Sequence, residues 1–175
     1  VYQHALSKIR ALDAGQGQLV PLLGEVLDLI DARAGLNIEI KQSGLNEPLR
    51  VLLKRHLSAQ PRWRNQLMIS SFICEVMRDF TTACPAGCLL GALTESDPEQ
   101  TIRHAVRSNF FSINLSIQQL SAALVAAAHI EGLKVLVYTV NAPDQMQRCE
   151  DLSVDGIFTD YPERAIAFFD QLHTI

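Results

Sequence analysis

FFSINLSIQQLSAALVAAAHIEGLKVLVYTV, residues 110–140, decides the fold. It contains two short runs rich in apolar residues, 110–116 and 134–140, whose length and flanks are typical of buried strands. The residues between them have a helical pattern, with Ser116 and Gln119 as a capping-box pair and a glycine at the end. The apolar stripe of this helix consists of Leu120, Leu124, Ala127 and Ile130. The stretch therefore predicts a strand, a helix and a second strand.

Strands and helices alternate over the rest of the chain as well. Further strand-like runs occur at 36–41, 67–72, 87–93 and 156–160. Helix starts with an early proline are found at Asp97-Pro98, Asn141-Ala142-Pro143 and Tyr161-Pro162. Ahead of the first strand we expect a short helix at 4–12, a loop at 15–17 and a helix at 21–33.

This alternation predicts parallel strands. Helical crossovers of about 20 residues place successive strands side by side in one direction, buried on both faces. A doubly wound sheet and a (β/α)8 TIM-type barrel both fit this pattern. A barrel has eight strands and typically about 250 residues, whereas this chain has 175 residues and six strand candidates. As a barrel, it would contain only about six strand-helix units, the third to the eighth, and would lack two units at the front.

Composition indicates a globular chain with one domain, residues 1–175. Apolar residues make up 48% of the chain and the formal net charge is −4, so we expect no nucleic-acid partner. We also expect no membrane span, because no apolar run reaches about 18 residues. The four cysteines lack the spacing of a zinc site and are expected to be reduced thiols, which favours a cytoplasmic protein.

The run 36–41 alternates between polar and apolar residues. Asn37, Glu39 and Lys41 share one face of the predicted strand. An edge strand with its charged face in water would explain this pattern. In a parallel α/β fold, such a face instead points into the barrel mouth, where a carboxylate and an ammonium need to pair or to serve a metal and an anion. We favour the second interpretation.

The ordered strands resemble those of the glycerophosphodiester phosphodiesterase family, especially its bacterial, cytoplasmic-type members. The Glu-x-Lys at Glu39 and the Ser-Phe at Ser71 are similar to the ends of two family strands. The runs 87–90, 135–141 and 156–162 are similar to its Gly-Leu-Leu, Trp/Tyr-Thr-Val-Asn and Gly-Ile-x-Thr-Asp-x-Pro strands. Each motif is short, but five in this order form a specific signal that covers nearly the whole chain.

The resemblance implies metal-dependent hydrolysis of glycerophosphodiesters to glycerol 3-phosphate and an alcohol, with Mg or Ca as the divalent metal. It implies that Glu39 is a metal ligand and that Lys41 contacts the substrate phosphate. In the family, two histidines move protons while the metal neutralises phosphoryl charge. Tyr138, in the aromatic position of Tyr-Thr-Val-Asn, is expected either to line the substrate pocket or to be a core aromatic with its hydroxyl bonded.

Part of the family's machinery has no counterpart in this sequence. Its His-Arg-Gly, Pro-Glu-Asn, Glu-x-Asp and His-Asp segments precede the strands matched here, so we assign no catalytic residue to this chain. Three of the five histidines, His56, His104 and His129, fall in predicted helices, and His4 and His173 lie near the termini. None is expected to replace the family histidines, because barrel chemistry collects at the C-terminal ends of strands. Asn141 is expected to cap a helix rather than to bind a ligand.

We therefore expect these 175 residues to be inactive alone. A six-stranded piece of a barrel exposes two strand edges, so we expect a homo-oligomer, an unstable chain or a complementing N-terminal segment. The alternative function is a non-catalytic barrel-derived binding or scaffold module that lost its catalytic front or pairs with another chain.

Overall fold

The computed structural model describes residues 4–172, and this part of the chain contains eight α-helices, one 3₁₀-helix and six strands. In chain order the elements are α1 (Leu6–Arg10), α2 (Leu23–Ile30), β1 (Leu36–Glu39), α3 (Asn46–Ala59), η1 (Pro61–Trp63), β2 (Leu67–Ser71), α4 (Cys74–Ala83), β3 (Cys88–Thr94), α5 (Pro98–Arg107), β4 (Ser112–Ser116), α6 (Ala122–Ile130), β5 (Lys134–Tyr138), α7 (Pro143–Asp151), β6 (Gly156–Ile157) and α8 (Pro162–Leu172).

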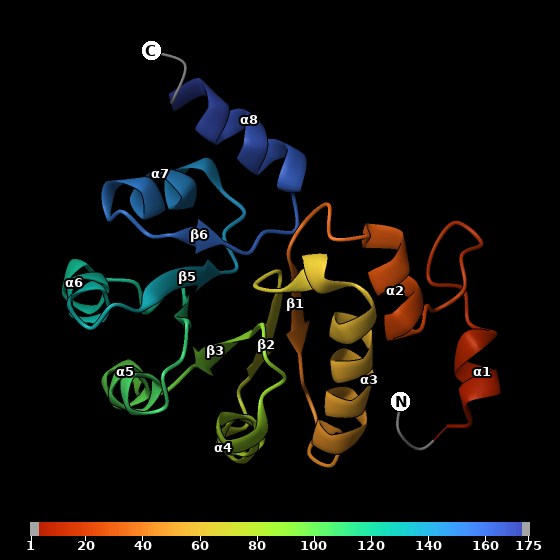
Figure 1. The fold of residues 1–175 in the computed structure, drawn as a ribbon. Helices are drawn as coiled ribbons and strands as arrows, with labels where there is room; N and C mark the ends of the chain where they lie inside the picture. The colour runs from red at the N-terminus through yellow and green to blue at the C-terminus, as the bar shows by residue number, and fades with distance from the viewer. Residues whose placement is uncertain (1–3, 173–175) are drawn as a thin grey trace.

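The six strands form one parallel sheet in the order β1-β2-β3-β4-β5-β6. The sheet curls into an arc, and α3 to α7 cover its outer side (Figure 1). A doubly wound sheet would reverse its strand order and carry helices on both faces, so the sequential order distinguishes the two predicted architectures. The expectation of about six units of a TIM-type barrel is confirmed, with all six strands at their predicted places.

The hydrophobic core lies between the outer face of the sheet and these helices. Leu67, Ile69, Ile113, Val135 and Val137 point to this side and are fully buried. At about 25 cal/mol per Å² of apolar surface removed from water, such strand residues supply the main favourable free energy for holding helices on the sheet. The helices on the outer face and the sheet therefore enclose a hydrophobic core of the kind that is usual in α/β proteins.

The predicted start of α6 is wrong. The helix begins after Ser121, whose side chain accepts a hydrogen bond from the Leu124 N–H at 3.3 Å, whereas the Ser116 hydroxyl accepts one from Gln118 in the preceding turn. The second half of the predicted stripe is also wrong, because Ala127 is exposed and Ile130 is 83% exposed, whereas Val125 and Ala128 are the buried residues of the helix. Alanine makes this helix apolar on every side, so periodicity could not identify the buried face.

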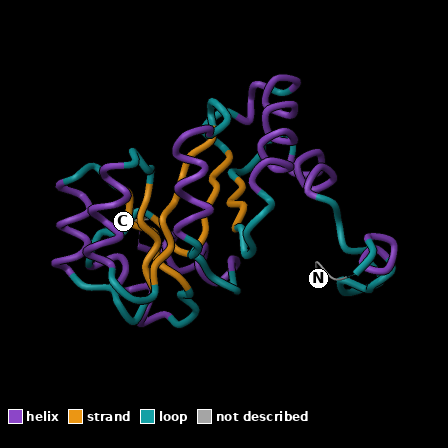
Figure 2. The backbone as a smooth tube through the Cα atoms, turned by 90° about the horizontal axis from the view of Figure 1, so that it is seen from below, coloured by secondary structure: helices purple, strands orange, loops and turns teal. Residues whose placement is uncertain are grey.

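The N-terminal elements agree with the predicted short helix, loop and helix. Figure 2 shows α1 and the loop after it to one side of the sheet. The Asp13 carboxylate accepts hydrogen bonds from the backbone of Gly15 and Gly17 at 2.7 and 3.0 Å, which holds that loop. Among residues 4–172, no helix has the length and apolar character needed to cross a membrane.

Candidate active site

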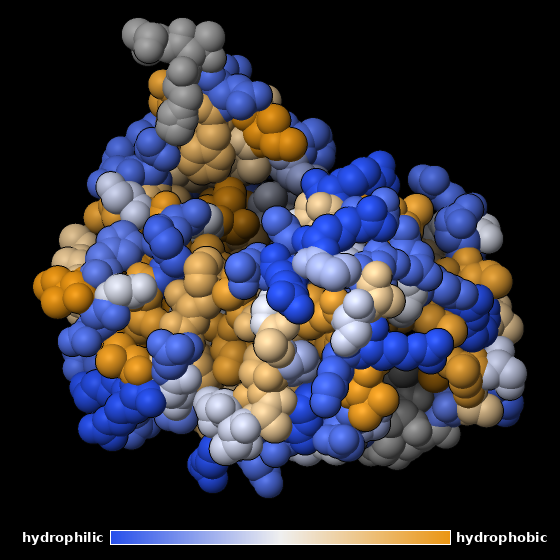
Figure 3. Space-filling model, viewed as in Figure 1, coloured by the Kyte–Doolittle hydropathy of each residue, from blue (hydrophilic) through white to orange (hydrophobic). Residues whose placement is uncertain are grey.

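The inner, concave face of the sheet carries most of the small and polar strand residues, together with Met68, Leu89 and Leu136. The strand register aligns Glu39 with Ser70, Ser70 with Gly91, and Gly91 with Ser112, so these residues face the same side. The Ser70 hydroxyl donates to Asn37 Oδ1 at 2.9 Å. Around this face the surface is mainly hydrophilic, with hydrophobic residues visible in a hollow beside α8 (Figure 3). The concave face is therefore the polar side of the sheet that the alternation in 36–41 predicts.

Glu39 and Lys41 lie at the C-terminal end of β1. Glu39 is the last residue of the strand, and Lys41 Nζ donates to Glu39 Oε1 at 2.8 Å. The Lys41 side chain is 77% exposed, compared with 28% for Glu39. A flexible, exposed ammonium can leave this pair for an incoming anion, whereas the carboxylate stays at the rim of the sheet.

Tyr138 lies at the C-terminal end of β5 and reaches across to β3. Its hydroxyl donates to the Thr94 carbonyl at 2.7 Å, and its ring packs edge-on against Phe72 at 5.7 Å between centroids. Burial, then the negative charges of Glu95 and Glu39, raise the pKa of Tyr138 to about 12. Tyr138 is therefore a half-buried, neutral aromatic residue with a bonded hydroxyl, and its expected place in the wall of a substrate pocket stays a prediction.

Glu95 is a further acidic residue at this end of the sheet that was not identified from the sequence. It directly follows Thr94, the last residue of β3, and is exposed. Its position after an apolar strand was the available signal, because barrel chemistry collects there. Glu95-Ser96-Asp97 also has Glu-x-Asp spacing, but Asp97 accepts a hydrogen bond from the Gln100 N–H at 2.8 Å and caps α5.

The described residues do not complete a divalent metal site. Ca²⁺ takes about six to eight oxygen ligands, and Mg²⁺ needs near-octahedral coordination. Among residues 4–172, no group of three or more His, Cys, Asp or Glu side chains is positioned to hold a metal ion. Glu39 supplies one carboxylate, which is itself paired with Lys41. These residues alone therefore do not fit Mg or Ca, and we assign no chemical step to a metal.

The histidines lie where the sequence predicts. His56, His104 and His129 are on α3, α5 and α6, the outer layer of helices, and His4 is exposed ahead of α1. His173 falls outside the described residues.

The predicted capping role of Asn141 is wrong. Its amide donates to Asp160 at 2.8 Å and accepts from the Thr159 hydroxyl and the Asp160 N–H at 3.1 and 3.0 Å. Gln145 instead caps the start of α7 by accepting from the Asn141 and Ala142 N–H groups at 3.0 and 3.1 Å. Asn141 therefore holds the connection between β6 and α8, which a local pattern could not reveal.

Several known proteins are similar to this chain over most of its length. It is 30% identical to a glycerophosphodiester phosphodiesterase of Caldanaerobacter subterraneus, covering 95% of this chain and 71% of that protein. It is 28% identical to one of Bacillus altitudinis, covering 87% and 64%. The chain thus spans roughly two thirds of these relatives.

Solved structures share the fold. An Oleispira antarctica phosphodiesterase, solved in complex with the product sn-glycerol-3-phosphate, matches with a TM-score of 0.83 and 23% identity over 97% of this chain and 72% of that chain. A glycerophosphodiester phosphodiesterase from Parabacteroides distasonis matches with a TM-score of 0.78 and 20% identity over 97% and 72%. The family model for glycerophosphoryl diester phosphodiesterases matches residues 1–164. The chain belongs to the glycerophosphoryl diester phosphodiesterase family.

Proposed function

We propose that the complete protein hydrolyses glycerophosphodiesters to glycerol 3-phosphate and an alcohol in a metal-dependent reaction. The family match over residues 1–164 carries this proposal. It is supported by the grouping of Glu39, Lys41 and Tyr138 at one end of the curled sheet, the end where parallel barrels place their chemistry. The free state of the cysteines supports a cytoplasmic protein, and residues 1–175 would belong to one domain.

Lys41 would bind the substrate phosphate. Its ammonium is exposed and held by Glu39 at 2.8 Å, so a phosphate oxygen can take over as its partner without burying a new charge. A fixed positive charge beside the phosphate stabilises the negative charge that develops as the bond to the leaving oxygen breaks. Glu39 would then be free to act as one oxygen ligand of Mg or Ca, with the other ligands supplied from outside the described groups.

Tyr138 would line the substrate pocket rather than move a proton. With its pKa raised to about 12, its phenol stays neutral at physiological pH. Its bond to Thr94 and its edge contact with Phe72 fix the ring in one orientation. A rigid aromatic wall restricts where the glycerol or alcohol part of the substrate can lie.

The test uses the full reading frame and measures glycerol 3-phosphate release from glycerophosphocholine with Mg or Ca. Lys41→Met is expected to lower kcat by about 10²–10³-fold, as for loss of one charge-stabilising donor. Glu39→Gln is expected to raise the metal concentration needed for half-maximal activity. Lys54→Met, which removes an exposed charge from α3, is the matched control. A kcat for Lys41→Met within twofold of the control would refute the phosphate role.

The 175 residues alone are expected to release no glycerol 3-phosphate, because the described residues, 4–172, do not complete a metal site by themselves. The open edges at β1 and β6 would be covered by a second copy of the chain or by a complementing segment. Size-exclusion chromatography with and without that segment distinguishes these two alternatives. Turnover by the 175-residue chain would overturn this expectation. An inactive full reading frame that still folds would instead favour a binding or scaffold module.

A further inference from the structure

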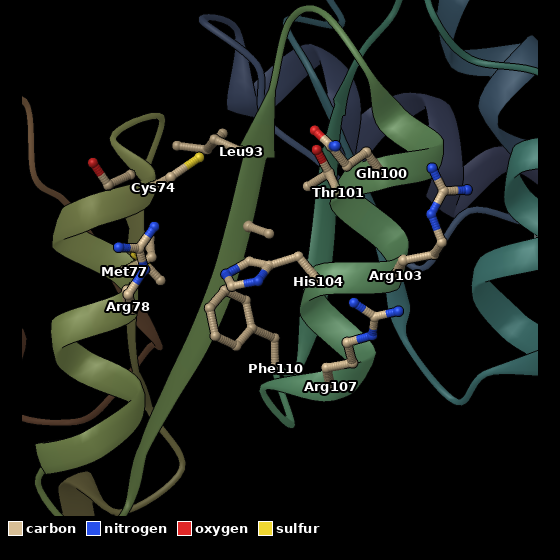
Figure 4. Close-up of a pocket in the computed structure, with 12 residues that line it drawn as sticks. Cys74, Met77, Arg78, Leu93, Gln100, Thr101, Arg103, His104, Arg107 and Phe110 are labelled. Atoms are coloured by element: carbon tan, nitrogen blue, oxygen red, sulfur yellow. The ribbon is translucent and has the colours of Figure 1, made fainter.

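A cavity lies between α4 and α5, on the outer side of the sheet (Figure 4). Its volume is about 380 Å³, within the range of about 300–1,000 Å³ that is usual for small-molecule pockets. Ser71 and Ala92 lie at its floor, level with each other on the face of β2 and β3 opposite to Ser70 and Gly91. The cavity is therefore separated from the concave face by the sheet itself.

The cavity has an apolar base. Met77, Ala92 and Phe110 line it and are 2%, 4% and 6% exposed. These groups come from α4, β3 and the turn before β4, so three elements hold the base in place. These residues are already almost fully buried, so they shape the cavity and leave little apolar surface for a ligand to cover.

The charged residues around this base are all basic. Arg78 of α4 and Arg103 and Arg107 of α5 line the cavity, and no Asp or Glu does so. Figure 4 shows Arg78 on the side that faces α5, whereas Arg103 points away from α4. Among the described residues, the guanidinium groups of Arg78 and Arg107 have no hydrogen-bond or ion-pair partner, although the Arg78 carbonyl accepts from the Thr81 hydroxyl at 2.7 Å. Two unpaired guanidinium groups beside one cavity, in a chain of net charge −4, leave a local positive potential for an anion.

His104 adds a buried polar group without a partner. Its ring projects from α5 over Phe110, at 5.7 Å between centroids, and lies between Arg78 and Arg107 in Figure 4. Its Nε2 is inaccessible to solvent and has no hydrogen-bond partner. A buried polar atom left unsatisfied is unfavourable. Because Nε2 is out of reach of solvent in this arrangement, a ligand would remove this penalty only by turning the His104 ring toward the cavity and bonding to Nε2 there.

We propose that this cavity binds a small organic anion, with a carboxylate or phosphate group held by Arg78, Arg107 and His104. The apolar part of the ligand would lie against Met77 and Phe110. A guanidinium presents paired N–H donors whose geometry matches the oxygens of either anion. The site is independent of the proposed catalytic face, because it uses the other side of the sheet.

The test is a calorimetric titration of the full-length protein at low ionic strength with phenyl phosphate, benzoate, inorganic phosphate and benzyl alcohol. The Lys41→Met background removes competition from the concave face. Phenyl phosphate or benzoate is expected to bind with a Kd of about 1 mM or tighter. Inorganic phosphate should bind at least tenfold more weakly, and benzyl alcohol should not bind measurably. Equal affinity for inorganic and phenyl phosphate, or no binding of either aryl anion, would overturn the proposal.

Variants assign the site. Arg78→Gln and Arg107→Gln are each expected to weaken aryl-anion binding about tenfold, the effect of losing one charge-assisted hydrogen bond. Arg55→Gln, which removes the same charge from exposed α3, should leave the Kd unchanged. His104→Phe keeps the ring packing but removes Nε2 and should also weaken binding.

If a variant fails to fold, the binding site can still be located from changes in the amide chemical shifts of the protein with its cavity unaltered. With the unaltered cavity, phenyl phosphate should shift signals of α4 and α5 and leave those of α7 in place. Shifts centred on any other element would contradict the assigned site.

Discussion

The Asp155 carboxylate joins three parts of the fold, and its removal gives a well-defined stability prediction. It accepts hydrogen bonds from Lys134 Nζ at 2.7 Å, from the Val135 N–H at 2.8 Å and from His129 Nε2, also at 2.8 Å. These partners come from the start of β5 and the end of α6. The carboxylate therefore accepts a hydrogen bond from the Val135 N–H, which has no backbone acceptor from β6 because that strand begins only at Gly156.

The size of the effect follows from the burial of each partner. In Asp155→Ala the buried Val135 N–H loses its acceptor, at a cost of about 1–3 kcal/mol. Lys134 and His129 are 52% and 37% exposed, so solvent limits each of their bonds to roughly 0–1 kcal/mol. We expect a total loss of about 2–4 kcal/mol for Asp155→Ala and about 1–2 kcal/mol for Asp155→Asn, which keeps one oxygen acceptor. For a chain of this length, each kcal/mol lowers Tm by about 2–4 °C.

Urea unfolding measured at several pH values tests this reasoning. Burial raises the pKa of Asp155, but the hydrogen bonds from Lys134, Val135 and His129 outweigh it and leave the pKa below its usual range. Because the folded pKa is lowered, the stabilisation is present above the unfolded pKa of about 3.9 and is lost as pH falls through the folded value. The gap between wild type and Asp155→Asn should therefore narrow below about pH 4. Asp28→Asn on exposed α2 is the control. A gap that is absent at pH 7, or that widens in acid, would refute the argument.

Three other changes have defined outcomes. Gly91→Ala should destabilise the protein by about 1–3 kcal/mol, because a Cβ there would lie 2.9 Å from Ser112 Oγ and 3.0 Å from Met68 Sδ. An unchanged urea unfolding curve would show that the side chains on the concave face can accommodate a methyl group. Spectrophotometric titration should show Tyr138 ionising near pH 12 in the wild type, and this ionisation should be missing from Tyr138→Phe. The free energy of unfolding should fall between about pH 10 and 12, because the phenol of the unfolded chain ionises first. Ionisation of Tyr138 near pH 10 in the folded protein would contradict its burial. Asp97→Ala should lower the free energy of unfolding by about 1 kcal/mol, because it removes the cap of α5. Asp97→Asn should retain most of that stability. Equal destabilisation by the two variants would show that the side-chain acceptor is not responsible.

Local patterns predict the strands and most helices of this fold. The β-branched runs, the early prolines and the charged face of 36–41 give all six strands their places, although the predicted strand 36–41 runs two residues beyond Glu39, where β1 ends. They fail at the start of α6, because Ser116 and Ser121 are both good caps and an alanine-rich helix has no distinct polar face.

The remaining features depend on contacts between distant residues. The Tyr138 bond to Thr94 spans 44 positions. Parallel pairing of β1, β2 and β3 places Glu95 at the same end of the sheet as Glu39. Asn141 bonds to residues 18 and 19 positions away rather than to its own helix. No window of local sequence contains such pairs, so the role of Asn141 could not be derived from capping rules, whereas Glu95 had only its position after an apolar strand as a signal.

The sequential strand order has a consequence for how this chain forms. Each strand after β1 pairs with the strand that comes before it in the sequence, so a newly added strand always finds its partner already present during synthesis. Loop-closure entropy grows slowly with loop length, and a constant short separation keeps that cost nearly the same for every step. The sheet can then form from β1 to β6 by repeated addition of one strand and its helix.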